Sequence, residues 1–388
     1  MTPTQGKFPL KAFTRLETPF YYYDLDVLRQ TLTTLKNEAQ KNRVNVHYAI
    51  KANANPRILS MIQMYGLGID CVSGGEIRAA LKAGVPADKI VFAGVGKSDW
   101  EINLALEAGI FCFNVESLPE LEVIAQLAAA RSVTAPVALR INPDVQADTH
   151  HYIATGMKEN KFGINLGDVD AVIDRALSLP QIRLVGLHFH IGSQILEMNN
   201  FAGLCSRVNE IQDRLARRNL MVEHINLGGG LGVDYHHPDQ AAVPDFAEYF
   251  STIRRMLRLR PGQSLHVEPG RSVVAQCGSL ISKVLYVKQG SARKFAILDA
   301  GMTELIRPAL YQAYHKIENI SSDEDAEKYD VVGPICESSD CFGKEVTLNR
   351  VRRGDYIAVR SAGAYGETMS SNYNLRPTPK SYFSDDLI

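Results

Sequence analysis

The stretch VNVHYAIKAN (residues 44–53) decides how the rest of this 388-residue chain is interpreted. An apolar, β-leaning run over residues 44–50 ends in Lys51, and Asn53 and Pro56 then break the pattern and start a helix. A lysine at the carboxyl end of a buried strand faces the open end of the sheet or barrel and not the packed core. The pattern therefore makes Lys51 a candidate for Schiff-base chemistry, although a solvated loop lysine has the same local sequence.

Short apolar runs alternate with amphipathic helical patterns from residue 44 onward. Strands are expected near residues 46–50, 67–72, 89–93, 110–115, 136–141, 183–190, 222–227 and 264–268. Helices are expected near residues 56–65, 75–83, 99–108, 117–130, 168–178, 201–218 and 245–258. Eight such alternations predict parallel strands in a closed (β/α)₈ barrel, rather than an open doubly wound sheet. No Gly-x-Gly-x-x-Gly follows an early strand, which disfavours a dinucleotide-binding fold.

The alternation of strands and helices stops after Arg271, where strand-like runs follow one another with little helix between them. These runs lie at residues 279–287, 294–298, 329–332 and 355–359. The strand-like run at residues 18–24 precedes the barrel and needs a sheet to pair with. The predicted fold class is therefore α/β, with a TIM-type barrel over residues 25–272 and a second β-rich domain, resembling a β-sandwich or β-barrel, formed by residues 1–24 and 273–388.

Composition excludes several classes of partner. The chain is 45% hydrophobic and 22% charged with a formal net charge of -1, so it has no field to attract nucleic acid or anionic lipid. The start lacks a signal-peptide core and no stretch approaches the ~20 apolar residues of a membrane helix, which predicts a cytoplasmic protein. The six cysteines contain no C-x-x-C pair, so we expect reduced thiols and no metal site.

Polar residues gather at the ends of the predicted barrel strands, where the chemistry of such barrels lies. They are Lys51, Asp70, Arg140, Asn142, His188, His190, Gly228–Gly230 and Glu268–Arg271. Each has an ordinary explanation when taken singly: a loop histidine, a glycine turn, a carboxylate paired with Arg271. Together they predict a site for a ligand that has a phosphate at one end and a flat ring, with the ring against His190 and Lys51 in front of the ligand. If the ring is a pyridine, Glu268 can keep its nitrogen protonated and so make the ring an electron sink.

At these residues the chain resembles the fold-type III pyridoxal-phosphate decarboxylases, most closely their diaminopimelate decarboxylase branch. The similar stretches cover nearly the whole chain. They are YAIKAN (48–53), GIDCVSGGE (68–76), RINPDV (140–145), TGMKENKFGI (155–164), GLHFHIGSQI (186–195), LGGGLG (227–232), EPGR (268–271), DAGMTELIRPALY (299–311), GPICESSD (333–340), GAYG (363–366) and YNLRP (373–377). Two departures are a short tail after residue 377 and Cys341-Phe342-Gly343 after Asp340.

The resemblance implies pyridoxal 5'-phosphate as cofactor and assigns roles to individual residues. The implied catalytic residues are Lys51, which carries the cofactor, Glu268 at the pyridine nitrogen, His190 stacked on the ring, and Cys336. Further implied cofactor-binding residues are Asp70, Ser193, Gly229, Gly230, Gly270, Arg271 and Tyr365. The implied substrate-binding residues are Arg271, Arg307, Tyr311, Glu337 and Tyr365.

The same resemblance implies an activity and a partner. The activity is decarboxylation of a small amino acid, meso-2,6-diaminopimelate, to L-lysine, the last step of lysine biosynthesis. The partner is a second copy of the chain, in a homodimer whose active sites are completed by Cys336 and Glu337 of the other subunit. The final proton could come from a group near Cys336 or from the freed Lys51, and the sequence does not choose between them.

Three alternatives remain at this stage. An ornithine or arginine decarboxylase needs an acidic group for a distal cation where this chain offers Arg307. An alanine racemase shares the domain plan but meets the ring nitrogen with arginine, against which Glu268 argues. A non-catalytic pyridoxal-phosphate carrier is expected to end after the barrel. A regulatory homologue is expected to lack Lys51 or the stretch at residues 333–340, and this chain has both.

Overall fold

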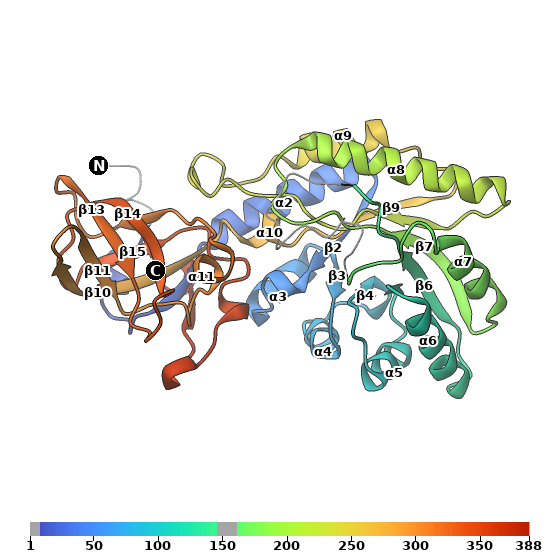
Figure 1. The fold of residues 1–388 in the computed structure, drawn as a ribbon, viewed down its shortest axis with the longest axis horizontal. Helices are drawn as coiled ribbons and strands as arrows, with labels where there is room; N and C mark the ends of the chain where they lie inside the picture. Colours follow the sequence, from blue (N-terminus) through green and yellow to red (C-terminus); the bar gives the residue numbers. More distant parts are fainter. Residues whose placement is uncertain (1–7, 146–160, 388) are drawn as a thin grey trace. The chain divides into compact units, whose positions relative to one another are not determined.

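The computed structural model describes residues 8–145 and 161–387 (Figure 1). The chain divides into two compact units. One comprises Leu32–Gly232 and Asp245–Arg271, and the other comprises the residues up to Thr31, Val233–Pro244 and the residues from Ser272 onward. Relative to the predicted boundaries, residues 25–31 and 233–244 group with the second unit. Much of TGMKENKFGI (155–164) lies outside the described residues.

The first unit is a closed barrel of eight parallel strands, as the sequence predicts. They are β2 (Val44–Ala49), β3 (Gly68–Cys71), β4 (Ile90–Phe92), β5 (Cys112–Val115), β6 (Ala135–Arg140), β7 (Ile182–His188), β8 (His224–Asn226) and β9 (Ser264–Val267). β9 pairs with β2 and closes the ring. Most strand residues are buried, because the strands of such a barrel are covered on both faces, and this explains why their sequences are continuously apolar.

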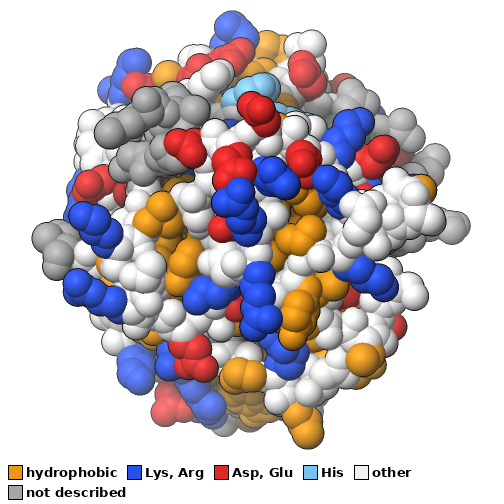
Figure 2. Space-filling model, turned by 90° about the vertical axis from the view of Figure 1, so that its left-hand side faces the viewer, with side chains coloured by type: hydrophobic (Ala, Val, Ile, Leu, Met, Phe, Trp, Pro, Cys, Tyr) orange, Lys and Arg blue, Asp and Glu red, His pale blue; other side chains and the backbone are white. Residues whose placement is uncertain are grey.

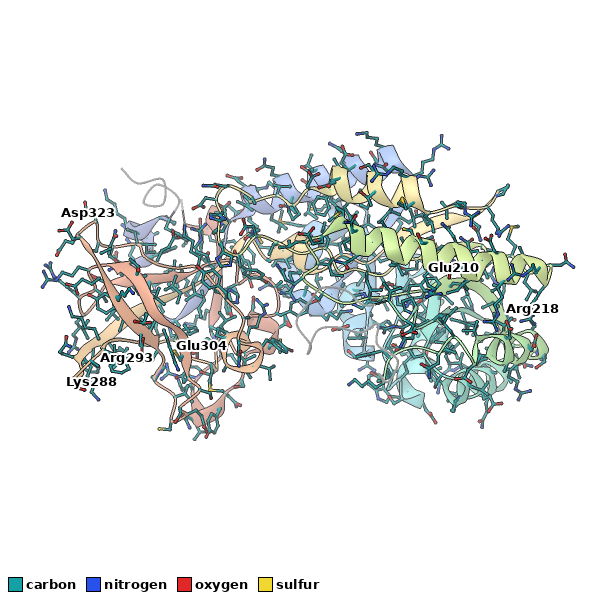
Figure 3. The ribbon with its side chains drawn as sticks, turned by 45° about the horizontal axis from the view of Figure 1, so that its top comes forward. Glu210, Arg218, Lys288, Arg293, Glu304 and Asp323 are labelled. Carbon is teal, nitrogen blue, oxygen red and sulfur yellow. The ribbon has the colours of Figure 1, made fainter. Side chains whose placement is uncertain are left out.

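One helix precedes the first strand of the barrel, and each of the others follows a strand. They are α2 (Leu25–Asn42), α3 (Pro56–Met64), α4 (Gly74–Lys82), α5 (Asp99–Ala108), α6 (Leu118–Ala130), α7 (Val169–Ser178), α8 (Met198–Arg217), α9 (Phe246–Met256) and the short α10 (Arg271–Val274). Several begin at a side chain that accepts a backbone N–H of the first turn, namely Asn55, Ser73, Ser117 and Asp245. Arg218, directly after α8, pairs with Asp170 and Asp174 of α7 (Figure 3).

Three buried histidines lie near the amino-terminal ends of the barrel strands. His47 Nε2 and His266 Nδ1 are 2.9 Å apart, and His224 packs with its ring centroid 4.9 Å from that of His266. Since His47 Nδ1 faces the carbonyl oxygen of Lys89, it carries a proton, and His47 Nε2 accepts from His266. The rings of His47 and His266 are therefore neutral, because each uses one nitrogen to donate and the other to accept. Burial, the largest cause, lowers the pKa of all three, that of His224 to about 4.

The lowered pKa of His224 predicts a loss of stability in acid. The unfolded chain takes up this proton as the pH falls through the ordinary value of 6.5, whereas the folded chain resists until about 4. Stability is therefore present above 6.5 and lost below it, by about 2 kcal/mol at about pH 5 for this group alone. The test is to measure the unfolding free energy by urea titration at about pH 7.5 and about pH 5. Between these two pH values, we expect a smaller fall in His224→Asn than in the wild type. An equal fall in the variant would contradict this, with exposed His236→Asn as control.

The second unit is built on a mixed sheet in the order β12-β15-β10-β11-β13-β14. The strands are β10 (Gly278–Gln289), β11 (Lys294–Leu298), β12 (Ile317–Asn319), β13 (Ala326–Val332), β14 (Cys341–Asn349) and β15 (Tyr356–Val359), joined by β1 (Phe20–Tyr23) and β16 (Lys380–Phe383). β1 pairs with β10, which confirms that the amino-terminal strand joins this sheet. Two short helices, α1 (Leu10–Phe13) and α11 (Arg307–Tyr311), complete the unit.

The distribution of charged side chains on the surface agrees with the near-neutral net charge. On the face shown in Figure 2, basic and acidic side chains are interspersed, without an extended field of one sign. Among the helices of residues 8–145 and 161–387, none is both long and apolar enough to cross a bilayer. Within the same residues, no cluster of three or more His, Cys, Asp and Glu side chains is placed to hold a metal ion.

Candidate active site

Lys51 lies just beyond the carboxyl end of β2. The strand ends at Ala49, and one turn of 3₁₀-helix, Ile50–Ala52, turns the chain so that the Lys51 side chain remains 40% exposed. Its Nζ lies 3.0 Å from Oδ2 of Asp70, a fully buried residue of β3. Burial, followed by the nearby charge of Glu268, raises the pKa of Asp70 to about 6, although Lys51 opposes the shift. An amine and a buried carboxyl group thus lie together at the carboxyl ends of two adjacent strands.

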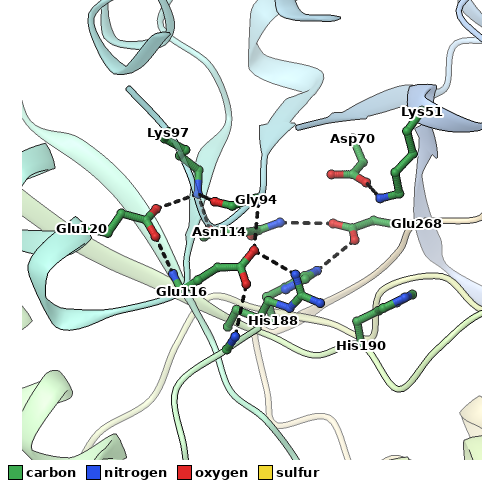
Figure 4. Close-up of polar contacts among 12 residues, drawn as sticks. Lys51, Asp70, Gly94, Lys97, Asn114, Glu116, Glu120, His188, His190 and Glu268 are labelled. Carbon is green, nitrogen blue, oxygen red and sulfur yellow. Dashed lines mark hydrogen bonds and ion pairs between the residues drawn. The ribbon is translucent and has the colours of Figure 1, made fainter. Parts of the chain in front are cut away.

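Glu268 follows β9 directly and is buried among three side-chain nitrogen atoms, two of which, from Asn114 and His188, are drawn in Figure 4. Burial acts to raise its pKa, but the contacts with His188 and the charge of Lys51 prevail and hold it well below the ordinary value. The carboxylate is therefore ionised. Arg271, the ordinary partner considered for Glu268, donates to Ser193 Oγ from Nε at 3.2 Å and from Nη2 at 2.9 Å.

His190 is fixed by the glycine segment after β8. The backbone N–H of Gly229 donates to His190 Nδ1 at 3.3 Å, so the proton of the neutral ring lies on Nε2. Burial first, and then the charge of Arg140, lowers the pKa of His190 well below the ordinary value. The ring is therefore neutral near pH 7. A partly exposed ring without a charge of its own thus lies at the carboxyl ends of the barrel strands.

Close packing explains the glycines of the site. A Cβ at Gly229 would lie 2.2 Å from the carbonyl oxygen of Glu268, so a side chain there would displace the backbone that carries the carboxylate. Gly230 has φ +115° and leaves only 2.8 Å between a built Cβ and the carbonyl oxygen of Gly192. At Gly270 a Cβ would come within 3.0 Å of that of Ala49. These positions hold the ends of β2, β8 and β9 together.

A buried charge network at the ends of β4, β5 and β6 was not predicted. Lys97 Nζ donates to Glu120 Oε1 at 2.6 Å and to the carbonyl oxygen of Asn114 at 2.9 Å. Glu116 accepts from Arg140 Nη1 at 2.8 Å (Figure 4). The sequence signals were Arg140 at a predicted strand end and the four-residue spacing of the two glutamates, which is also common on exposed helices. The network fixes the carboxyl end of β5, which carries Asn114.

Arg307 of the second unit is buried against two side chains that sequence reasoning missed. Its Nη1 lies 2.9 Å from Tyr235 Oη and 2.9 Å from His315 Nε2. His315 Nδ1 carries the proton that faces the carbonyl oxygen of Arg360 at 2.8 Å, so Nε2 accepts the guanidinium proton. The predicted partner Tyr311 is the last residue of α11, the helix that Arg307 begins. The two lie within one short helix.

Cys336 and Glu337 are exposed at the tip of a loop with a buried base. Asp340 forms the base and accepts the backbone N–H groups of Met302 at 2.6 Å and of Ile335 at 2.7 Å. At the tip, Cys336 donates its N–H to Asn374 Oδ1 at 3.2 Å, and Tyr373 Oη donates to Glu337 Oε1 at 2.8 Å. Tyr365 lies elsewhere in this unit, half-buried with φ +56°.

The predicted site residues thus fall into two groups. The barrel unit brings together Lys51, Asp70, His190, Ser193, Gly229, Gly230, Glu268, Gly270 and Arg271, whereas the β-rich unit carries Arg307, Tyr311, Cys336, Glu337 and Tyr365.

Comparison with known proteins identifies the family. Residues 25–275 match the pyridoxal-dependent decarboxylase family, in its pyridoxal binding domain. The chain is 66% identical over 385 residues to the diaminopimelate decarboxylase of Bacteroides thetaiotaomicron, covering 99% of this chain and 100% of that protein. The chain belongs to the diaminopimelate decarboxylase family.

Other members of this family are similar along most of their length. The enzyme of Neisseria meningitidis serogroup B is 43% identical, over 92% of this chain and 86% of that protein. The crystal structure of the Helicobacter pylori diaminopimelate decarboxylase complexed with L-lysine superposes with a TM-score of 0.91 at 40% identity, covering 97% of this chain and 94% of that one. The fold predicted from the sequence is therefore that of the family.

Family membership implies pyridoxal phosphate as cofactor, and the barrel residues fit it. Two buried polar atoms, Asp70 Oδ1 and His188 Nδ1, have no hydrogen-bond partner within the described residues, as expected where a polar group is to be accommodated. The strand ends also present an amine, an ionised carboxylate, a neutral ring and the Arg271 guanidinium. These are the groups that an aldehyde, a pyridine nitrogen, a flat ring and a phosphate would need.

Proposed function

We propose that this chain decarboxylates meso-2,6-diaminopimelate to L-lysine and carbon dioxide, with pyridoxal phosphate as cofactor. The observation that carries the proposal is the buried, ionised Glu268 in the same group of strand ends as Lys51. A carboxylate at this place favours a protonated ring nitrogen and hence loss of carbon dioxide, in contrast to the arginine of a racemase. The activity of the Bacteroides relative, at 66% identity, supports the choice of substrate.

Each barrel residue has a definite task in this proposal. When bound, pyridoxal phosphate supplies the sink for the electron pair of the breaking bond to the carboxylate. The Lys51 amine would hold its aldehyde carbon, and Asp70 would orient that amine. Glu268 would hold the proton at the ring nitrogen, and neutral His190 would cover one face of the ring.

The phosphate and substrate need further groups. Arg271, oriented by Ser193, would bind the phosphate with a charge that a neutral donor does not supply. Arg307 would bind the distal carboxylate of the substrate, because a guanidinium pairs with a carboxylate through two parallel N–H groups. Ornithine and arginine carry a cation at that end, which Arg307 would repel.

Replacing Arg307 with alanine is expected to weaken transition-state binding of diaminopimelate by roughly 2–5 kcal/mol, measured as kcat/KM, because one partner of a charge pair is lost. Cofactor absorption should stay unchanged. Arg307→Lys is the matched control, since it keeps the charge without the two-pronged geometry and should recover part of the activity. If the loss were equal for lysine, which lacks the distal carboxylate, Arg307 would have another task.

We also propose that the working unit is a homodimer in which Cys336 and Glu337 of each chain complete the site of the other, with Cys336 as a catalytic residue. The support is the form of the loop: a thiol and a carboxylate are exposed at its tip, whereas its base is fixed by buried Asp340. A two-fold axis creates two equivalent shared sites at once.

The substrate proposal is tested by comparing rates on four amino acids with the cofactor-loaded protein. Diaminopimelate should be preferred over ornithine, arginine and lysine by about 100-fold or more, because the wrong distal group leaves buried Arg307 without its counter-charge. Faster turnover of ornithine or arginine would move the chain to the neighbouring activity. Cofactor binding without turnover of any of the four would favour a non-catalytic homologue.

A further inference from the structure

Glu268 is held by three side-chain nitrogen atoms from three different strands. Asn114 of β5 and Asn226 of β8 place their Nδ2 atoms 3.2 and 2.7 Å from Oε1. His188 of β7 places Nε2 2.8 Å from Oε2. Because the carboxylate follows β9, it is fixed by the neighbouring strand β8 and by β5 and β7, which do not pair with β9. Figure 4 shows the contacts from Asn114 and His188. Of these three contacts, only the one from His188 is made to Oε2.

The two asparagines cannot turn to compensate for one another. Asn226 Oδ1 accepts the backbone N–H of Gly228 at 2.9 Å, which fixes its amide orientation and leaves Nδ2 facing Glu268. The Oδ1 atom of Asn114 accepts from the Cys112 thiol at 3.8 Å, which leaves Nδ2 facing Glu268, and its backbone carbonyl accepts from Lys97 Nζ at 2.9 Å. Both amides therefore act on Oε1 alone, and the direction of Oε2 depends on His188.

Glu268 is the polar partner through which the ring of His188 is held. His188 is 1% exposed, and its Nδ1 is buried without a hydrogen-bond partner in the described part of the chain. Since a carboxylate only accepts, Nε2 must carry the proton that faces Glu268. A histidine that served the scaffold would be expected to use both ring nitrogens, as His47 does.

We propose that His188 is a positioning residue, which holds Glu268 ionised and directs its carboxylate toward the ring nitrogen of the cofactor. The proposal rests on the proposed function for the identity of the cofactor and deepens it. Glu268 is fully buried, and without its donors burial alone would drive the carboxyl group toward its neutral form. A neutral carboxyl group would not keep the ring nitrogen protonated.

Two variants separate the hydrogen bond from the volume of the ring. His188→Leu fills the space without a donor, and His188→Gln restores an N–H group. The matched control is His224→Leu, the same change in another buried barrel histidine whose ring lies against Cys112 and Phe111 instead of the carboxylate.

The first readout is the titration of Glu268 in the cofactor-free protein, followed by NMR of ¹³C-labelled glutamate carboxyl carbons and assigned with Glu268→Gln. We expect His188→Leu to raise this pKa by about one to two units, as for the loss of one charged hydrogen bond, and His188→Gln to reverse most of the shift. The second readout is the absorption spectrum of the bound cofactor against pH. It should change in His188→Leu and not in His224→Leu.

Turnover should fall about 10- to 100-fold in His188→Leu, the range typical for loss of a group that orients a reactive one. The proposal is overturned if His188→Leu leaves both the Glu268 titration and the cofactor spectrum as in the wild type, or if His224→Leu changes them equally. Neither readout uses an amino-acid substrate. Failure of the diaminopimelate assay with a shifted Glu268 would thus reject the substrate and leave His188 in place.

Discussion

Replacing Lys51 with alanine is expected to abolish turnover and the visible absorption that the cofactor owes to its bond with the protein. The amine of Lys51 is the group that would hold the aldehyde, and no other lysine side chain is among the predicted residues of this site. Loss of a covalent catalytic group lowers kcat by about 10⁴-fold or more. The measurement is lysine formation together with a spectrum of the purified variant.

The control for this prediction is Lys82→Ala, which removes an exposed lysine from α4 of the same unit. It should keep full activity and the full spectrum. Turnover by Lys51→Ala at the wild-type rate would show that the amine has no part in the chemistry.

Mixing two inactive variants is expected to restore about a quarter of the wild-type sites. If each site uses Lys51 of one chain and Cys336 of the other, a mixed dimer of Lys51→Ala and Cys336→Ala carries both lesions in one site and none in the other. Random pairing makes half of the dimers mixed, so about one site in four is intact. The measurement is activity after subunit exchange under mild unfolding, with exchange followed by a mass tag.

A site formed within one chain predicts a different result. Every site would then keep one lesion whatever the pairing. Activity that stays at the level of the separate variants, although the mass tag shows that exchange took place, would contradict the shared site.

The barrel and half of the site could be predicted from the sequence for a simple physical reason. Strands that are covered on both faces need continuous apolar runs, and these locate the strand ends to within two residues. Lys51, Asp70 and Glu268 are charged residues at such ends, so their convergence follows from the parallel order of the strands.

The remaining features depend on contacts that local sequence does not encode. Asn114 is 154 residues from Glu268 and Asn226 is 42 residues away, and an asparagine in a strand gives no sign of what its amide meets. The same holds for Tyr235 beside Arg307, 72 residues apart in sequence. The strand β12, with three residues, is too short to show an alternating pattern.

The central claim is that Lys51, at the carboxyl end of β2, carries the cofactor of a decarboxylase site. The most direct measurement is borohydride reduction of the cofactor-loaded protein, followed by digestion and mass spectrometry of the peptides. The account predicts a pyridoxyl-phosphate adduct on the peptide that contains Lys51, with the fragment ions placing it on that residue. An adduct on another lysine, with the Lys51 peptide unmodified, would contradict it.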